Sequence, residues 1–119
     1  MLLRSLDEIS PEEVDIPGMK GVTTQSAFIE HEMLPGFHVR MFSLEPKGCT
    51  GLHWHRQQHV HYIVSGEGLF VGKDEQETPI QAGQVVLVPS LDPHSVINSS
   101  DHSVLRFFDV VGPCGYNPG

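Results

Sequence analysis

Glycine and proline interrupt this chain at close intervals from residue 19 onward, and this spacing leaves little room for a long helix. The intervals hold segments of about 4 to 10 residues rich in Val, Ile, Phe, Leu, Tyr and Thr, the residue types that favour strands. Apolar residues at helical spacing are not sustained anywhere in this region. We therefore predict an all-β chain, with strands at residues 20–29, 37–45, 58–65, 68–72, 76–80, 84–88, 94–97 and 103–111.

Residues 1–18 have a different pattern and are expected to form a short lead-in to one compact domain at residues 19–119. Ser10 and Glu13 have the spacing of a capping box, which predicts one short helical turn at most. A chain of 119 residues has the usual size of a single domain. Many short strands fit a sandwich, a jelly roll or a small barrel, and periodicity alone does not separate these.

Charge and hydropathy exclude several classes of partner. The formal net charge is −8 and only 7 residues are Lys or Arg, whereas nucleic acids and anionic membranes bind through clustered basic residues. No apolar run approaches the roughly 20 residues that a membrane span needs. We expect a soluble, cytoplasmic protein whose partner is a small molecule. Two cysteines, Cys49 and Cys114, do not make a disulfide framework and are expected to be free thiols.

Histidine is the residue type that points to chemistry, because four of the 8 histidines lie within nine positions: His53, His55, His59 and His61. Side chains alternate faces along an extended chain, so His53 and His55 point the same way. If the strand resumes in register after residues 56–58, His59 and His61 return to that face. Imidazole is the commonest side-chain metal ligand. A single histidine is more often an ordinary surface residue, but this spacing favours a metal site.

Two familiar zinc arrangements do not fit the cluster. A zinc finger needs cysteines at short spacing, and a zincin needs His-Glu-x-x-His on a helix. His55 and His59 have the outer spacing of a zincin, but Arg56 follows His55 where the glutamate would stand. A second segment, residues 83–98, offers a further ligand. In this segment a buried strand leads through a proline turn into a new strand that begins with His94.

The two segments resemble the two motifs of the cupin family, G-x5-H-x-H-x3-4-E-x6-G and G-x5-P-x-G-x2-H-x3-N. The resemblance spans residues 37–111. His59 replaces the usual glutamate, Leu91 replaces a glycine, and Gly48 lies one residue too close to His53. The positions that match the two motifs are His53, His55, Gly66, Gly83, Pro89, His94 and Asn98.

The resemblance implies a jelly-roll barrel, the double-stranded β-helix of cupins. The chain is most similar in pattern to small bacterial cupins with four histidine ligands, which bind manganese or a similar ion. These cupins share an arginine-bearing strand before a Glu-Pro turn, here Arg40 and Glu45-Pro46. The resemblance also implies a homodimer and one divalent ion per chain, with manganese first, iron next, and zinc, nickel, copper or cobalt still open. The implied metal ligands are His53, His55, His59 and His94.

Four neutral imidazoles leave the full charge of the ion uncompensated, which makes it more electrophilic and more attractive to an anionic ligand. An octahedral ion keeps two further positions, which are adjacent in cupins and would accept a chelating substrate or dioxygen. Arg40 would hold a carboxylate or carbonyl if it faces the pocket, and it could equally face outward. His61 is interpreted either as a proton carrier beside the ligands or as a packed core residue.

The lining of the pocket is less determined by the pattern. Val96 follows His94 by two residues and is expected to share its face. In the last strand, Leu105, Phe107 and Val111 share one face and Arg106, Phe108 and Val110 the other. Subgroup resemblance favours the second set, Arg106, Phe108 and Val110, as pocket-lining residues. Trp54 lies between two ligands and is expected to point away from them, toward solvent, a packing layer or a subunit interface.

Four functions remain open on this basis. The leading hypothesis is a metal-dependent oxidoreductase of the dioxygenase type that acts on a small organic substrate. The second is an isomerase, lyase or hydrolase in which the ion acts as a Lewis acid and His61 moves a proton. The third is a non-catalytic module that binds a small molecule, since a fold does not determine a function. The fourth is a fortuitous histidine cluster without metal.

Overall fold

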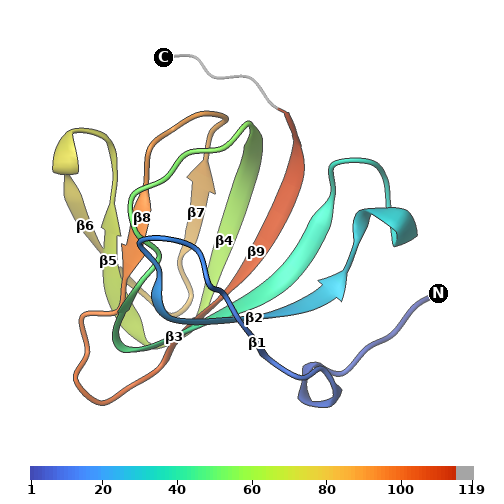
Figure 1. Ribbon diagram of the computed structural model, residues 1–119, viewed down its shortest axis with the longest axis horizontal. Coiled ribbons are helices and arrows are strands. Elements are labelled where there is room, and N and C mark those ends of the chain that lie inside the picture. Colours follow the sequence, from blue (N-terminus) through green and yellow to red (C-terminus); the bar gives the residue numbers. More distant parts are fainter. Residues whose placement is uncertain (115–119) are drawn as a thin grey trace.

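The computed structural model describes residues 1–114, with side chains up to residue 113 (Figure 1). Within that range the chain is built from strands and three single-turn 3-10 helices, η1 (Leu6–Glu8), η2 (Glu30–Glu32) and η3 (Lys73–Glu75). The strands are β1 (Glu12–Glu13), β2 (Lys20–Phe28), β3 (His38–Cys49), β4 (Gln57–Ser65), β5 (Glu67–Val71), β6 (Glu77–Gln81), β7 (Val85–Val88), β8 (Ser95–Ile97) and β9 (Leu105–Cys114). None of the helices in the described range is long and apolar enough to cross a membrane.

All strands pair antiparallel in one sheet of order β6-β5-β8-β3-β9-β4-β7, and β2 and then β1 continue from β3. The sheet curls on itself (Figure 1), and its inner face lines a hollow whose wall includes Phe42 of β3 and Phe107 of β9. Strands that are distant in sequence, such as β3 and β9, are therefore neighbours. The prediction of an all-β jelly-roll barrel is confirmed, and each of the eight predicted strands has a counterpart within a few residues.

The hydrophobic core occupies part of the hollow. Leu44 and Leu105 are fully buried, and Ile63 and Phe107 are nearly so. Phe42 stacks on Phe107 with ring centroids 5.3 Å apart. Burying a side chain of this size contributes roughly 1.5–3 kcal/mol. Because these residues alternate with outward-facing ones on β3, β4 and β9, the core fixes the face on which each strand presents its polar side chains.

The lead-in differs from the prediction. The capping-box spacing at Ser10 and Glu13 predicts a helical turn, but Glu12 and Glu13 form β1 and pair with Thr24 and Thr23 of β2. The helical turn lies earlier, at Leu6–Glu8. An exposed capping box contributes only about 1 kcal/mol, and pairing with the edge of β2 supplies backbone partners instead. The amide of Gln25 donates to the carbonyls of Leu6 and Ile9, at 2.8 Å each, and holds the lead-in against the sheet.

Turn geometry explains two of the motif positions. Gly66 has φ +87, and a Cβ there would lie 2.6 Å from the carbonyl oxygen of Val104, so only glycine fits. Leu91, which stands where the cupin motif has glycine, has φ +65 and keeps the left-handed turn at a cost in strain. Its side chain is exposed, so it enters no core contact.

Cys49 is a free thiol, and the side chain of Cys114 lies outside the described part of the chain.

Candidate metal centre

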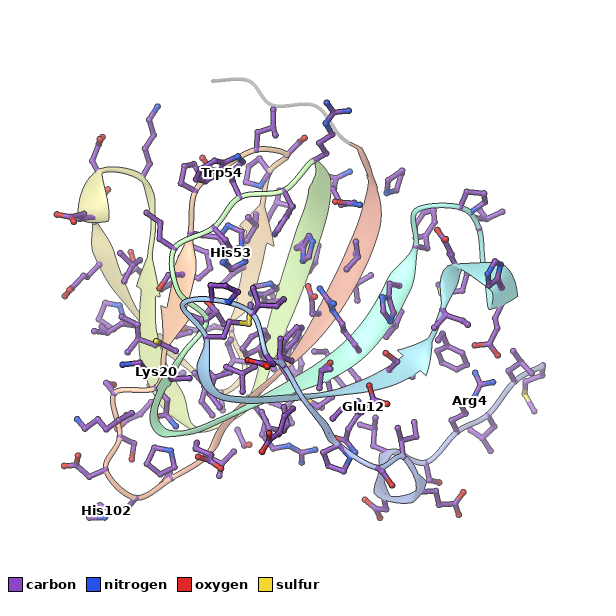
Figure 2. All side chains as sticks on the ribbon, viewed as in Figure 1. Arg4, Glu12, Lys20, His53, Trp54 and His102 are labelled. Carbon is purple, nitrogen blue, oxygen red and sulfur yellow. The ribbon has the colours of Figure 1, made fainter. Side chains whose placement is uncertain are left out.

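Three of the predicted ligands meet at one end of the hollow. Ring nitrogens of His53, His55 and His94 all lie within 4.8 Å of one another. The backbones of His53 and His94 pair through two hydrogen bonds of 3.0 and 2.9 Å, which brings the second motif beside the first. Figure 2 labels His53 within the curled sheet. The expectation that a distant segment adds His94 to the cluster therefore agrees with the geometry.

Backbone carbonyls fix the orientation of these three rings. Nδ1 of His53, His55 and His94 lies 2.8 Å from the carbonyl oxygen of Gly51, Gln57 and Asp92, respectively. A carbonyl oxygen only accepts, so each Nδ1 donates and carries the ring hydrogen. The lone pair of each neutral ring is then on Nε2. This is the arrangement that metal-binding histidines adopt, with the outer nitrogen donating to an oxygen.

The cluster has the character of a cation site. Nε2 of His55 lies 3.3 Å from Nε2 of His94, so two acceptor lone pairs face each other. Burial lowers the pKa of His55 and lowers that of His94 to about 3, and the neighbouring histidines add to both effects. At neutral pH a proton therefore binds only weakly between the two Nε2 atoms. A divalent ion that accepts nitrogen ligands fits the donor set.

His59 lies against this group but has a different partner. Its ring stacks on that of His55 with centroids 3.8 Å apart. Its Nδ1 donates to Oδ1 of Asp109 at 2.7 Å, which leaves the Nε2 lone pair free, as in the other three rings. The ring nitrogens of His59 and His61 and a carboxylate oxygen of Asp109 also lie within 4.8 Å of one another, in a second buried group.

Asp109 is a functional candidate that the sequence reasoning missed. Its side chain is 1% exposed, and its two oxygens face three cationic or potentially cationic groups. Oδ1 accepts from His59 and lies 3.3 Å from Nε2 of His61, while Oδ2 accepts from Nε of Arg40 at 2.8 Å. Burial raises the pKa of this carboxyl, but the hydrogen bonds from His59 and His61 outweigh burial and hold the pKa well below its usual value. Asp109 is therefore a buried, charged carboxylate that holds the side chains of His59 and Arg40 in position.

The expected facing of β9 is wrong. Phe107, Asp109 and Val111 face the hollow, while Val110 is 38% exposed on the outer side. Arg106 also points outward and donates to the hydroxyl of Ser43 at 3.3 Å. The register explains the difference, because Asp109 stands opposite Arg40 on β3 and His61 on β4. Each face of β9 carries one charged residue among apolar ones, so the sequence pattern alone could not determine which face lines the cavity. Arg106, Phe108 and Val110 do not line the cavity.

A cavity of about 370 Å³ opens beside the cluster. Arg40, His61 and Val96 all line it. Trp54 is 64% exposed and also contributes to the cavity wall, next to the histidines from which it was expected to point away. The lead-in supplies wall residues that the sequence reasoning did not consider, because a segment outside the motifs carries no pattern that places it. Apolar side chains of the wall are Val14, Ile16, Met19, Phe42, Trp54, Val96 and Phe107.

His61 combines features of the two interpretations given above, the packed core residue and the proton carrier beside the ligands. It is 5% exposed and stacks on Phe107 with ring centroids 4.7 Å apart, as a core residue does. Its Nε2 faces the Asp109 carboxylate, and within the described part of the chain its Nδ1 has no hydrogen-bond partner. An unpaired buried nitrogen costs roughly 1–3 kcal/mol. His61 is therefore a packed residue with one buried nitrogen that has no partner among the described residues.

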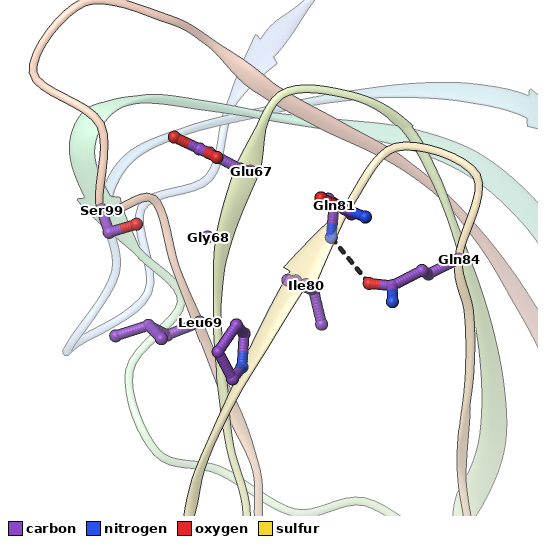
Figure 3. A pocket seen from close by; sticks show the side chains of 8 residues that line it. Glu67, Gly68, Leu69, Ile80, Gln81, Gln84 and Ser99 are labelled. Atoms are coloured by element: carbon purple, nitrogen blue, oxygen red, sulfur yellow. Dashed lines mark hydrogen bonds between the residues drawn. The ribbon is translucent and has the colours of Figure 1, made fainter.

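A second hollow, on the outer side of β5 and β6, has a different character (Figure 3). It measures about 440 Å³ and includes Glu67, Leu69 and Ser99 in its lining. The backbone N–H of Gln81 donates to the side-chain oxygen of Gln84 there at 2.8 Å. Among the residues that the structure describes, its lining contains no histidine and one carboxylate, so it lacks the donors that a transition metal needs. The cavity beside the histidines is the better candidate site.

Comparison with known proteins identifies the family. Residues 40–111 match the cupin domain, and the chain belongs to the cupin family. An oxalate-binding protein from Thermotoga maritima is 34% identical over 118 residues, which is 93% of each chain. An acireductone dioxygenase from Geobacillus thermodenitrificans is 30% identical over 70 residues, 55% of this chain and 39% of the other.

Two solved structures extend this comparison. The structure of a predicted oxalate decarboxylase from Thermotoga maritima has a TM-score of 0.85 at 30% identity and covers 95% of this chain and 99% of the other. The polyketide cyclase RemF from Streptomyces resistomycificus has the same TM-score at 24% identity and covers 99% and 82%. At that identity RemF supports the fold alone. The similar proteins and structures thus differ in their described activities, and similarity alone does not determine the reaction of this chain.

Proposed function

We propose that this cupin is a cytoplasmic, metal-dependent oxidoreductase of the dioxygenase type that acts on a small organic substrate. In this proposal His53, His55, His59 and His94 hold one divalent ion. The observation that carries the proposal is that all four rings form a hydrogen bond to an oxygen atom through Nδ1. Each Nδ1 donates to an oxygen atom, so each ring has its Nε2 lone pair left for an ion.

Manganese is the ion we expect first and iron second, on the strength of the resemblance to four-histidine cupins. Nitrogen donors alone would also accept zinc, copper, nickel or cobalt. The bound ion would supply a Lewis-acidic centre and, as manganese or iron, a redox partner for dioxygen. Because the proposed ligands are neutral, an anionic oxygen ligand is favoured in the remaining positions.

The residues around the cluster have separate tasks in this proposal. Nε of Arg40 is engaged by Asp109, whereas within the described residues its two terminal nitrogens have no hydrogen-bond acceptor and can hold a carboxylate or carbonyl of the substrate. The apolar wall, which includes Phe42 and Val96, excludes water from the bound compound. Nδ1 of His61 can accept a proton or hydrogen bond from it.

Oxygen uptake tests the oxidoreductase proposal. Tag-free protein loaded with manganese or iron is screened against small chelating compounds, such as hydroxy-ketones, enediols and dicarboxylates, in an oxygen electrode. We expect substrate-dependent oxygen consumption that is lost in His53→Ala and unchanged in His102→Ala, which removes an exposed histidine outside the cluster. Turnover that continues at the same rate without oxygen would instead favour the metal-dependent isomerase or lyase.

Binding without turnover is the second candidate, and the oxalate-binding relative favours it. A divalent ion whose charge is not compensated by its ligands, next to Arg40, would favour binding of a small dicarboxylate. Titration calorimetry with oxalate distinguishes the two functions. Saturable, metal-dependent binding with no oxygen uptake by any compound in the screen would replace the oxidoreductase proposal with a binding function.

A further inference from the structure

The cavity beside the histidines has a polar part and an apolar part. The strand register places Arg40 of β3, Asp109 of β9 and His61 of β4 side by side on the inner face of the sheet. Phe42 and Phe107 lie two residues along β3 and β9 from Arg40 and Asp109, and they pair with each other. Residues two apart on a strand share a face, so a polar row and an apolar row are neighbours. A compound in this cavity therefore contacts polar side chains at one end and apolar side chains at the other.

The apolar part of the wall continues to the surface of the molecule. Val96 and Phe107 are buried in the interior, whereas Ile16 of the lead-in is 53% exposed and Trp54 is 64% exposed, and all four belong to the wall. Figure 2 shows Trp54 above His53, toward the upper edge of the curled sheet. A bound apolar group would therefore cover the exposed indole of Trp54 as well as the interior of the cavity.

The volume of the cavity is larger than a two-carbon diacid requires. Its 370 Å³ lies in the range of roughly 300–1,000 Å³ that is typical of pockets for small organic ligands. At the packing density of a protein interior this space holds on the order of 10 non-hydrogen atoms. Oxalate would contact Arg40 and the proposed ion but would leave the apolar wall uncovered. The cavity is therefore suited to a longer compound.

The lining also limits where such a compound can carry charge. Apart from the histidines, the charged side chains among the described lining residues are Arg40 and Asp109, which bond to each other. An anionic group is therefore matched only close to Arg40 and the proposed ion. A carboxylate at the apolar end would have no basic partner, and burial of an unpaired charge is strongly unfavourable. We therefore expect the charge of the ligand at one end alone.

We propose that the substrate has one chelating, singly charged head and an uncharged aromatic body, and that Trp54 selects it by packing against that body. This inference rests on the proposed function, because it assigns the head to the divalent ion and Arg40. The body is aromatic because a ring packed on an indole gains attraction beyond its buried area. Trp54 therefore determines which compound is preferred and takes no part in the chemistry at the ion.

Three hydroxamates with the same chelating head test this inference. Acetohydroxamate has a methyl body, benzohydroxamate an aromatic body, and succinate monohydroxamate a longer body that ends in a carboxylate. Titration calorimetry on metal-loaded, tag-free protein gives their dissociation constants. We expect benzohydroxamate to bind about 10- to 100-fold more tightly than acetohydroxamate, because one ring is buried, and succinate monohydroxamate to bind no more tightly than acetohydroxamate. Because Trp54 is the single tryptophan of the chain, its fluorescence emission should change on saturation with benzohydroxamate.

The variants are compared by the ratio of the acetohydroxamate to the benzohydroxamate dissociation constant, which cancels any effect of a substitution on the ion itself. Trp54→Ala should lower this ratio about 10-fold, and Trp54→Phe, which keeps a ring, should lower it by less than about 3-fold. Tyr62→Ala is the matched control, because Tyr62 is an exposed aromatic residue on the outer face of β4. Its ratio should equal that of the wild type.

The inference and the proposed function fail in different ways. Benzohydroxamate that binds no more tightly than acetohydroxamate would overturn the inference. So would succinate monohydroxamate that binds as tightly as benzohydroxamate, or a ratio that Trp54→Ala leaves unchanged. Selective binding of benzohydroxamate by a protein that consumes no oxygen would support the inference and contradict the oxidoreductase proposal. Oxygen uptake without that selectivity would do the reverse.

Discussion

At the scale of single residues, the spacing of the histidines carries most of the information about the site. His53 and His55 alternate onto one face, and the motif offset brings His94 to them. Asp109 could not be found in this way. A lone acid in an apolar strand is ordinarily outward-facing, and only the register against Arg40 and His61 shows that it is buried. The pairing of distant strands, and not the local sequence pattern, therefore determines where Asp109 lies and which charged groups it contacts.

Asp109→Asn tests this residue. Asparagine keeps the shape of the side chain but removes the charge that orients His59 and neutralises Arg40. We expect affinity for the metal to fall by about 10- to 100-fold, as for other partners of metal-binding histidines. Competition with a chromophoric chelator measures it. Asp101→Asn changes an exposed carboxylate that pairs with Lys47, and this variant should bind metal as the wild type does. Equal affinity in both variants would contradict a positioning role for Asp109.

At the scale of elements, the strands were predictable because turn residues separate them and β-branched and aromatic residues fill them. The facing of β9 was not predictable, since its two faces are almost equally apolar. The segment at Ser10 and Glu13 has a helix-start spacing, but it joins β2 because the free strand edge offers backbone partners that an isolated turn lacks. A local preference for a helical turn contributes only about 1 kcal/mol here. Pairing with a neighbouring strand is therefore enough to override it.

The turn before β7 gives a test at this scale. Gly83 has φ +92 and Gly72 has φ −102, and a Cβ at either position meets nothing within 4 Å. Alanine at Gly83 should therefore lower the free energy of unfolding by about 1–2 kcal/mol through backbone strain alone. Alanine at Gly72 should change it by less than about 0.5 kcal/mol or raise it slightly. Urea unfolding compares the two, and equal effects would contradict the assigned turn geometry.

At the scale of the whole molecule, the sequence predicts the jelly roll and the family, but not the contribution of the lead-in to the cavity wall. Val14 and Ile16 of the lead-in reach the cavity wall from outside both motifs. Residues 1–18 have no periodicity that would place them there.

Metal removal tests the coupling between site and fold. An ion that binds only the folded chain stabilises it by about 2.7 kcal/mol at a free concentration of 100 times Kd, which corresponds to roughly 10 °C in Tm for a domain of this size. A chelator should therefore lower Tm by about that amount, and added manganese should restore it. His53→Ala should show little change under the same treatment. An unchanged wild-type Tm would mean that the ion contributes nothing to the folded state.

The central claim is that four imidazoles hold one divalent ion, and X-ray absorption on tag-free protein tests it most directly. Elemental analysis first gives the metal content of the sample, and the absorption fine structure then counts its nitrogen neighbours. We predict one ion per chain with four imidazole nitrogens around it, and three in His59→Ala, the ligand whose Nδ1 is held by Asp109. A substoichiometric ion, or a wild-type shell with three imidazoles that His59→Ala leaves unchanged, would contradict the four-histidine centre.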